Sequence, residues 1–353
     1  MAVPRGASLA KGRPAGAGRD PFFDNAKFLL IVLVVVGHHW GPMTGAARSV
    51  HAGYLFVYAF HMPLFALLCG YFSRGFTGRP EQIRKLITTV LVPYLVFETV
   101  YAGMYTLCWG EPFSITPAQP RYLCWFLVAL FVWRLSTPLW RAVRWPIVLA
   151  LLISLAAGLT YTGDSLALAK VLGFLPWFVL GLCLRPAHFR PLRTVAARRC
   201  ALPVLLGGVA AAYWASPLLG ANWLGMEVGY ADLGVSPERY LGTRCALFGV
   251  AAVLCAAFLA LVPTGRTWFT VLGAVTMYPY LLHGLVIKGV ESVGFHDLTA
   301  AGGHLAIVLT TVCAAALTVP LSSVPVRRVL RPVIEGRFPR PLIPRRERER
   351  SPS

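Results

Sequence analysis

Ionisable side chains mark one face of the first apolar segment of the chain. Asp24 and Lys27 stand near its start, and ten uncharged residues separate Lys27 from His38. Each residue of an α-helix turns by about 100° and rises by about 1.5 Å. Lys27 and His38 therefore share a face, roughly 16 Å apart along the axis, with Asp24 within about 40° of it. Because such groups are costly inside an apolar helix, the stripe predicts a functional site that faces the interior of a helix bundle.

The chemistry open to this stripe depends on His38. Its imidazole is either a reactive group that accepts and releases a proton or a hydrogen-bonded contact between helices. Asp24 and Lys27 also fit a plain ion pair that anchors the helix end at an interface. The next residue, His39, points about 100° away from His38 and is expected to join two helices.

Two further histidines lie in other apolar segments. His61 occurs in the second segment and His283 in the ninth. Counted from the segment ends, both reach a depth similar to that of His38. We expect these imidazoles to line a polar cavity together with Glu98 of the third segment. No carboxylate or thiolate accompanies them at ligand spacing, so no metal is expected.

The elements that must position these residues are membrane helices. The chain has 353 residues, of which 57% are hydrophobic and only 13% are charged. This composition excludes a soluble domain and predicts an all-α, multi-pass membrane protein. Ten apolar stretches approach the length that spans a bilayer: about 26–44, 53–73, 86–108, 122–140, 146–162, 167–184, 201–219, 245–263, 268–290 and 304–324.

The formal net charge of +19 could indicate either nucleic-acid binding or membrane topology. The distribution of the charges along the chain distinguishes these two interpretations. If the chain starts inside, Lys and Arg gather in every second connection, as the positive-inside rule requires. We therefore predict that both termini are cytoplasmic, that anionic lipids are partners and that nucleic acid is not. The strong preference for arginine over lysine is typical of a GC-rich bacterial genome and favours a bacterial plasma membrane.

Three regions follow from composition. Residues 1–18 are rich in Gly, Ala and Pro, which predicts a disordered cytoplasmic leader. Residues 19–335 hold all the apolar segments and are expected to form one membrane domain. Residues 336–353 predict a basic, disordered cytoplasmic tail. The eight cysteines show no metal spacing, and only Cys108 and Cys124 flank an outer loop in which a disulfide is an option.

The order of these motifs resembles the acyltransferase 3 family of membrane O-acyltransferases, over nearly the whole chain. The motifs that carry the resemblance are Asp24-x-x-Lys27 with ten residues to His38, His61-Met-Pro-Leu-Phe65, Val92-Pro93-Tyr94, Trp125-Phe126-Leu127 and Tyr280-Leu-Leu-His283. Lys27 and the pair Gly37-His38 are most similar to the fucose 4-O-acetylase-like branch. Many relatives carry arginine in place of Lys27, and the lysine lacks the bidentate fork that arginine offers a phosphate.

This resemblance implies that an acyl group, commonly acetyl, passes from a cytoplasmic acyl-coenzyme A to a hydroxyl of an extracytoplasmic glycan, glycolipid or related metabolite. Acetyl-CoA or another short acyl-CoA is then the co-substrate. The basic residue and the histidine of the family pattern correspond to Lys27 and His38.

The residues suit this reaction on chemical grounds. A sugar hydroxyl attacks a thioester slowly, and a neutral imidazole can accept its proton as the bond forms, which is worth about 10² to 10⁴ in rate. His38 is the candidate base, with Lys27 and Asp24 along the path to it, and His61 could orient the acceptor or stabilise the oxyanion. Basic side chains on the cytoplasmic side could bind the coenzyme phosphates: Arg74, Arg84, Lys85 and Arg144.

Two other classes of function remain open from the sequence. A proton-coupled transporter or exporter of an anion or glycolipid could use the same histidines as a relay. Such a transporter would typically show interrupted helices in matching halves, and no such pair is evident. A structural scaffold would leave the charged stripe unexplained.

Overall fold

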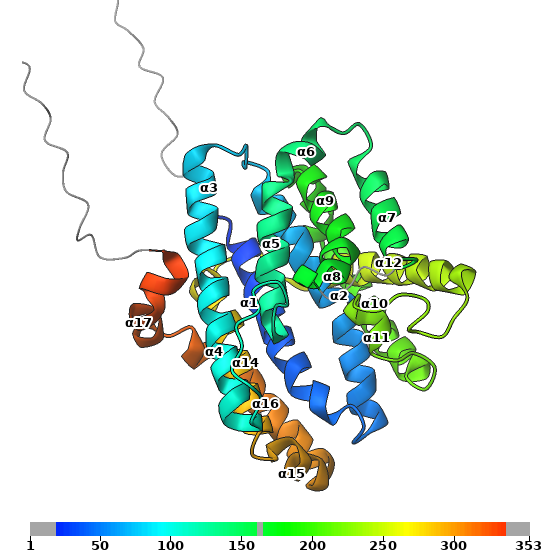
Figure 1. Cartoon of the computed structure of the whole chain (residues 1–353). Coiled ribbons are helices and arrows are strands. Elements are labelled where there is room, and N and C mark those ends of the chain that lie inside the picture. Colours follow the sequence, from blue (N-terminus) through cyan, green and yellow to red (C-terminus); the bar gives the residue numbers. More distant parts are fainter. Residues whose placement is uncertain (1–18, 161–164, 337–353) are drawn as a thin grey trace, which may run out of the picture.

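The computed structural model describes residues 19–160 and 165–336, and within these ranges it contains helices and no strands (Figure 1). This confirms the all-α prediction. The predicted leader, 1–18, and all but the first residue of the predicted tail, 336–353, lie outside the described residues.

Among the residues that the structure describes, six helices are long and apolar enough to cross a membrane, so the chain is a multi-pass membrane protein. They are α1 with the short η1 (Pro21–Met43), α2 (Arg48–Ser73), the continuous unit of α3, η2 and α4 (Pro80–Trp109), α10 (Val195–Ala215), α12 (Pro237–Leu261) and α16 (Gly303–Leu321). A bent pair forms a seventh span if its halves are counted together: η4 with α8 (Ser165–Gly173) and α9 (Leu175–Cys183), at 53° to each other.

Three predicted spans are shorter in the structure. Their helices are α5 (Trp125–Leu135), α7 (Pro146–Ala157) and α14 (Met277–Glu291). α5 stops because a separate helix, α6 (Thr137–Ala142), starts at Thr137 with a proline in its first turn. The predicted span 268–290 is divided into α13 (Thr270–Gly273) and α14. The total of ten spans therefore stays a prediction.

The division before α14 has a packing reason. Gly273, at the end of α13, lies so close to α1 that a Cβ atom there would overlap the carbonyl oxygen of Asp24. Asn25 of α1 also donates hydrogen bonds to the carbonyls of Pro263 and Gly265, at 2.9 and 2.8 Å. The start of α1 is thus fixed against the 263–273 segment, which prevents α13 and α14 from forming one straight helix.

Glycines also allow a close helix contact in the core, between α2 and α9. A Cβ atom on Gly70 would overlap the carbonyl oxygen of Phe178, and one on Gly181 would overlap the carbonyl oxygen of Leu67. Around this contact lies the largest cluster of buried apolar side chains, which draws on α1, α2, α5, α9 and α12. The core therefore surrounds α2 and holds α1 beside it.

The basic connections meet at one end of the bundle, which we call the basic end. Arg193 binds the carboxylate of Asp20 at 2.8 Å, and Arg74 donates to the carbonyl of Leu184 at 2.9 Å. Arg141 donates to the carbonyl of Arg74. In Figure 1, α3 (Pro80–Leu86) and α6 lie at this end and α15 (Phe295–Ala301) lies at the opposite end.

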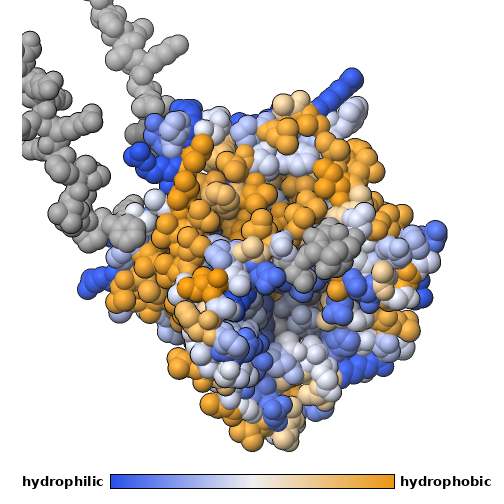
Figure 2. Space-filling view, viewed as in Figure 1, coloured by the Kyte–Doolittle hydropathy of each residue, from blue (hydrophilic) through white to orange (hydrophobic). Residues whose placement is uncertain are grey.

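The outer surface fits a lipid environment. Apolar side chains are exposed on α10 and α16, for example Leu206 and Val312, each at 61%. Figure 2 shows hydrophobic residues gathered along α4 (Val92–Trp109) and a hollow in the lower half of the same face. The last helix, α17 (Val324–Glu335), lies beside α4 (Figure 1) and packs Leu330 and Ile334 against the bundle.

Candidate active site

The charged stripe lies on α1 as predicted, because α1 is continuous from Pro21 to Trp40. The Asp20 side chain caps its first turn by accepting from the Phe22 N–H at 3.0 Å. Asp24 is buried and pairs with two cations, Lys27 at 2.8 Å and Arg19 at 2.7 Å. Asp24 and Lys27 thus form an ion pair, which by itself does not determine the role of His38.

A cavity of about 660 Å³ starts at the basic end and follows this stripe into the bundle. Lys27, Ile31 and Val34 of α1 line it, and they lie on the helix face that carries His38. The opposite wall includes Thr89 and Val90 of η2 (Ile87–Leu91), a π-helical turn. Wide turns of this kind are common at functional sites.

The inner end of this cavity lies directly beneath the histidines. Three of its lining residues, Val34, Met62 and Tyr280, stand within one helical turn of His38, His61 and His283, each on the same helix as its histidine. The rings of Tyr280 and His283 are 6.3 Å apart. A molecule that fills the cavity therefore ends next to the imidazoles.

The structure brings the three predicted histidines together. The ring centroids of His38 and His283 are 5.3 Å apart. The ring of Tyr58 lies near both His38 and His61, at 6.2 Å and 4.6 Å between ring centroids. His61 and His283 are fully buried, whereas His38 is partly exposed. Of the three, His38 is the most exposed.

Backbone carbonyls fix the tautomers of two of these imidazoles. The Nδ1 atom of His61 lies 2.8 Å from the carbonyl oxygen of Val57, and that of His283 lies 2.8 Å from the carbonyl oxygen of Pro279. Because a carbonyl only accepts, Nδ1 carries the hydrogen in both rings, and Nε2 of the neutral ring is an acceptor. Nε2 of His283 has no partner among the described residues.

The partner of His38 is a residue that the sequence reasoning missed. The hydroxyl of Tyr122 lies 2.9 Å from Nδ1 of His38. Tyr122 begins η3 (Tyr122–Cys124) with a φ of 47°, a left-handed conformation that is costly for a bulky residue. In the sequence it looks like an ordinary interfacial tyrosine, so no signal singled it out.

Glu98 holds the residue that precedes Tyr122. Its buried carboxylate accepts from the backbone N–H of Arg121 at 2.8 Å and from the Arg121 guanidinium at 3.2 Å. On the other side, the hydroxyl of Tyr280 donates to the carbonyl of Leu123 at 2.5 Å. Glu98 thus contacts Arg121 and none of the three histidines, and its place in the substrate pocket stays a prediction.

His39 joins two helices, as expected. Its Nε2 atom lies 3.1 Å from the Thr310 hydroxyl of α16, and its ring lies 5.2 Å from the ring of His296. Cys108 and Cys124 are not bonded to each other. Within the described residues there is no group of three or more His, Cys, Asp and Glu side chains that could hold a metal.

Two lysines approach His38 from the opposite end. Both lie within electrostatic reach of its ring. Lys170 binds Glu227 at 2.5 Å and lies 5.1 Å from the centre of the Trp125 ring. Lys288 lies 5.1 Å from the centre of the Tyr122 ring. Neither lysine stands out in the sequence as a neighbour of His38.

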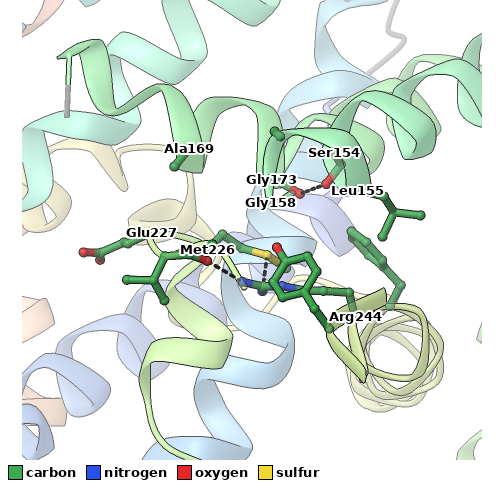
Figure 3. A pocket seen from close by; sticks show the side chains of 13 residues that line it. Ser154, Leu155, Gly158, Ala169, Gly173, Met226, Glu227 and Arg244 are labelled. Carbon is green, nitrogen blue, oxygen red and sulfur yellow. Dashed lines mark hydrogen bonds between the residues drawn. The ribbon is translucent and has the colours of Figure 1, made fainter. Parts of the chain in front are cut away.

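Buried Arg244 supports the loop that carries Glu227. It donates to the carbonyl of Trp223 at 2.5 Å and contacts the sulfur of Met226 at 2.7 Å. Figure 3 shows Glu227 pointing away from this cluster. The cavity beside Arg244 measures only about 20 Å³, enough for about one water molecule. We therefore assign Arg244 a structural role.

The predicted phosphate-binding residues divide into two groups. Lys85 lines the large cavity, whereas Arg74, Arg84 and Arg144 are not among its lining residues. Arg74 is occupied by backbone carbonyls and the face of Tyr71. Arg19 and Arg134 line the mouth in their place. A loop arginine satisfies the positive-inside rule whichever way its side chain points, so the sequence could not show which of these cations face the cavity.

Comparison with known proteins agrees with this architecture. Residues 20–326 match the family described as Acyltransferase domain. The nodulation protein NolL of Mesorhizobium japonicum (strain LMG 29417 / CECT 9101 / MAFF 303099) is 44% identical over 101 residues, which are 26% of this chain and 27% of that protein. The chain thus aligns with about a quarter of the length of this curated relative. No solved structure matches the chain.

The fucose 4-O-acetylase-like branch stays a prediction, because neither comparison separates one branch from another. The match to the family model, in contrast, runs from the start of α1 to the start of α17 and covers most of the chain. The protein therefore belongs to the acyltransferase 3 family of multi-pass membrane acyltransferases.

Proposed function

We propose that the protein transfers a short acyl group, such as acetyl, from acyl-CoA to a hydroxyl, with His38 as the general base. The observation that carries this proposal is the position of the large cavity. It starts among cations at the basic end and stops beneath His38, beside Val34, Met62 and Tyr280. A transporter would use the same histidines as a relay, and the family match favours the transferase.

The reaction needs one base that becomes an acid. As the hydroxyl oxygen attacks the thioester carbonyl, Nε2 of His38 accepts the hydroxyl proton. The tetrahedral intermediate then collapses, the carbon–sulfur bond breaks, and the leaving thiolate takes the proton from the imidazolium. Nε2 can play this part when the Nδ1–H of His38 donates to Tyr122, whose hydroxyl can accept it.

The tautomer of His61 refines its predicted role. An oxyanion needs hydrogen-bond donors, whereas Nε2 of neutral His61 is an acceptor because Nδ1–H donates to Val57. His61 is therefore better suited to receive a hydrogen bond from the acceptor hydroxyl than to stabilise the oxyanion. His283, with the same arrangement, would share that task.

The donor side fits a phosphate-bearing coenzyme. Four cations stand at the mouth of the cavity: Arg19, Lys27, Lys85 and Arg134. The deeper walls are apolar and include Phe65 and Phe126, which suits an uncharged pantetheine arm and a short acyl group. Acetyl-CoA or another short acyl-CoA has this distribution of charge.

The acceptor would arrive from the opposite end. The aromatic rings of Tyr54, Tyr58 and Trp125 and the ion pair of Lys170 with Glu227 surround the approach to His38 from that end. Aromatic walls with a few fixed polar groups are typical of ligand sites and suit a glycan, a lipid-linked sugar or a related metabolite. The hollow in Figure 2 lies in the lower half of the view, toward this end.

A conservative change at Tyr122 tests the orientation of the base. We expect Tyr122→Phe to lower turnover about two- to tenfold, because one hydrogen bond to His38 is lost while the imidazole remains. Steady-state assays in isolated membranes with saturating acyl-CoA would measure this. Unchanged turnover would show that the bond to Nδ1 has no part in catalysis.

We place the basic end in the cytoplasm of a bacterial cell, with both termini and anionic lipid on that side. In a variant without native cysteines, Ala231→Cys should react with an impermeant maleimide in intact cells. Arg190→Cys should react only after permeabilisation. Both positions are exposed in the structure. The reverse labelling pattern would overturn this topology.

The proposed function itself is tested by deletion. A strain without this protein should lose ester-linked acyl groups from an envelope glycan or secreted metabolite, as seen by mass spectrometry, and regain them with the wild-type chain. Unchanged acylation in the deletion strain, with altered export of an anion or glycolipid, would support the transporter alternative instead.

A further inference from the structure

The large cavity of about 660 Å³, in which the proposed function places acyl-CoA, is the donor cavity. A second cavity adjoins it at the basic end. It measures about 270 Å³ and is lined by the end of α2, the loop that follows it, α3 and the end of α5. Three residues, Phe72, Lys85 and Arg134, line both cavities. The two spaces therefore meet at a common wall of one aromatic ring and two cations.

The loop that forms this second cavity is held in place by Gln82. Its side-chain amide donates to the carbonyl of Gly75 at 2.9 Å and accepts from the backbone N–H of Thr77 at 2.8 Å. These bonds fix Phe76 as part of the lining, facing the same space as Phe72. The Phe72 ring meets the ring of Phe23 edge-on, at 5.4 Å between centroids, and the Nζ atom of Lys27 lies 5.5 Å from its centre. Phe72 is still 49% exposed, so part of the ring is open to a ligand.

The two cations of the common wall, Lys85 and Arg134, have hydrogen-bond donors that no other described residue uses. Arg134 uses its Nε atom to donate to the Ser73 hydroxyl at 3.2 Å, and its two terminal nitrogens make no hydrogen bond within the described residues. Lys85 forms no ion pair within the same part of the chain. A guanidinium and an ammonium with free donors are suited to phosphate oxygens.

We propose that this second cavity binds the nucleotide end of acyl-CoA, an inference that rests on the proposed function. The adenine would pack against Phe72 and Phe76, and the phosphates would lie at the common wall between Lys85 and Arg134. The pantetheine arm would then enter the large cavity. A space of about 270 Å³ is slightly smaller than typical small-molecule sites of roughly 300–1,000 Å³, which suits a purine rather than a whole coenzyme.

Binding by the purified full-length protein tests this without knowledge of the acceptor. Radiolabelled acetyl-CoA serves as the probe, and adenosine 3′,5′-bisphosphate and S-acetylpantetheine serve as competitors for its two halves. We expect Phe76→Leu, which changes a residue that lines the second cavity and not the large one, to weaken competition by the bisphosphate about tenfold or more and to leave competition by S-acetylpantetheine within about twofold. Arg134→Gln should also weaken competition by the bisphosphate about tenfold or more, because a charged donor to the phosphates is lost. Arg266→Gln, an exposed cation outside both cavities, is the matched control.

Three results would overturn the proposal. Equal losses for both competitors, or no loss for either, would mean that the second cavity does not bind the nucleotide. Competition by phosphatidylglycerol vesicles but not by the bisphosphate would identify a lipid headgroup site. Failure of the wild type to bind acetyl-CoA at all would refute the donor in the proposed function, and this outcome differs from the other two.

Discussion

Replacing His38 by Ala is expected to lower the turnover of acyl transfer at least about a hundredfold, the usual loss when a general base is removed. The effect should fall on the chemical step, with the apparent affinity for acyl-CoA little changed, because His38 is not among the residues that line the donor cavity. Steady-state kinetics in membranes from cells that produce equal amounts of protein would measure both constants.

The adjacent histidine provides the comparison. His39 binds Thr310 on another face of α1, so His39→Ala should reduce stability more than turnover per folded molecule. His304→Ala is a second control, because His304 is exposed and does not line the donor cavity. A His38→Ala variant that acylates at near wild-type rates would return His38 to the role of a contact between helices.

Replacing Lys27 by Met is expected to raise the acyl-CoA concentration needed for half-maximal rate by about tenfold or more. A hydrogen bond to a charged group contributes about 1.5–3 kcal/mol, and Lys27 is the cation that stands deepest along the α1 wall of the donor cavity. Turnover at saturating donor should change less than this. Titration of acyl-CoA in isolated membranes would separate the two effects.

Charge and geometry can be distinguished at the same position. Lys27→Arg keeps the positive charge, and many relatives of the resembled family carry arginine there, so this variant should retain most of the donor affinity. Asp24 would keep Arg19 as a partner in either variant. If Lys27→Met left the donor requirement unchanged, Lys27 would serve only to pair with Asp24 and anchor the helix.

The parts of the site that follow a helical period could be predicted from the sequence. Lys27, Ile31 and Val34 line one cavity because they share a face of α1, and that face leads to His38. Counting depth along apolar segments also brought His61 and His283 to the correct level. These inferences succeed because a helix fixes both direction and rise for every residue.

The parts that depend on loops could not be predicted. Tyr122 reaches His38 because Glu98 fixes Arg121, in a loop whose path no periodicity describes. The sequence likewise could not show that Arg134, rather than Arg144, faces the donor cavity. The division of the predicted span 268–290 into α13 and α14 could not be predicted either. It lies beside the contact of Gly273 with Asp24, which joins residues far apart in the chain.

We expect an acyl group supplied at the basic end to reach a hydroxyl by way of His38. Oriented membrane vesicles with radiolabelled acetyl-CoA added outside test it directly, through alkali-labile label in vesicle glycans. Inside-out vesicles of the wild type should incorporate label, whereas right-side-out vesicles and inside-out vesicles of His38→Ala should not. Equal incorporation from both faces, or full incorporation by the His38→Ala protein, would contradict the account.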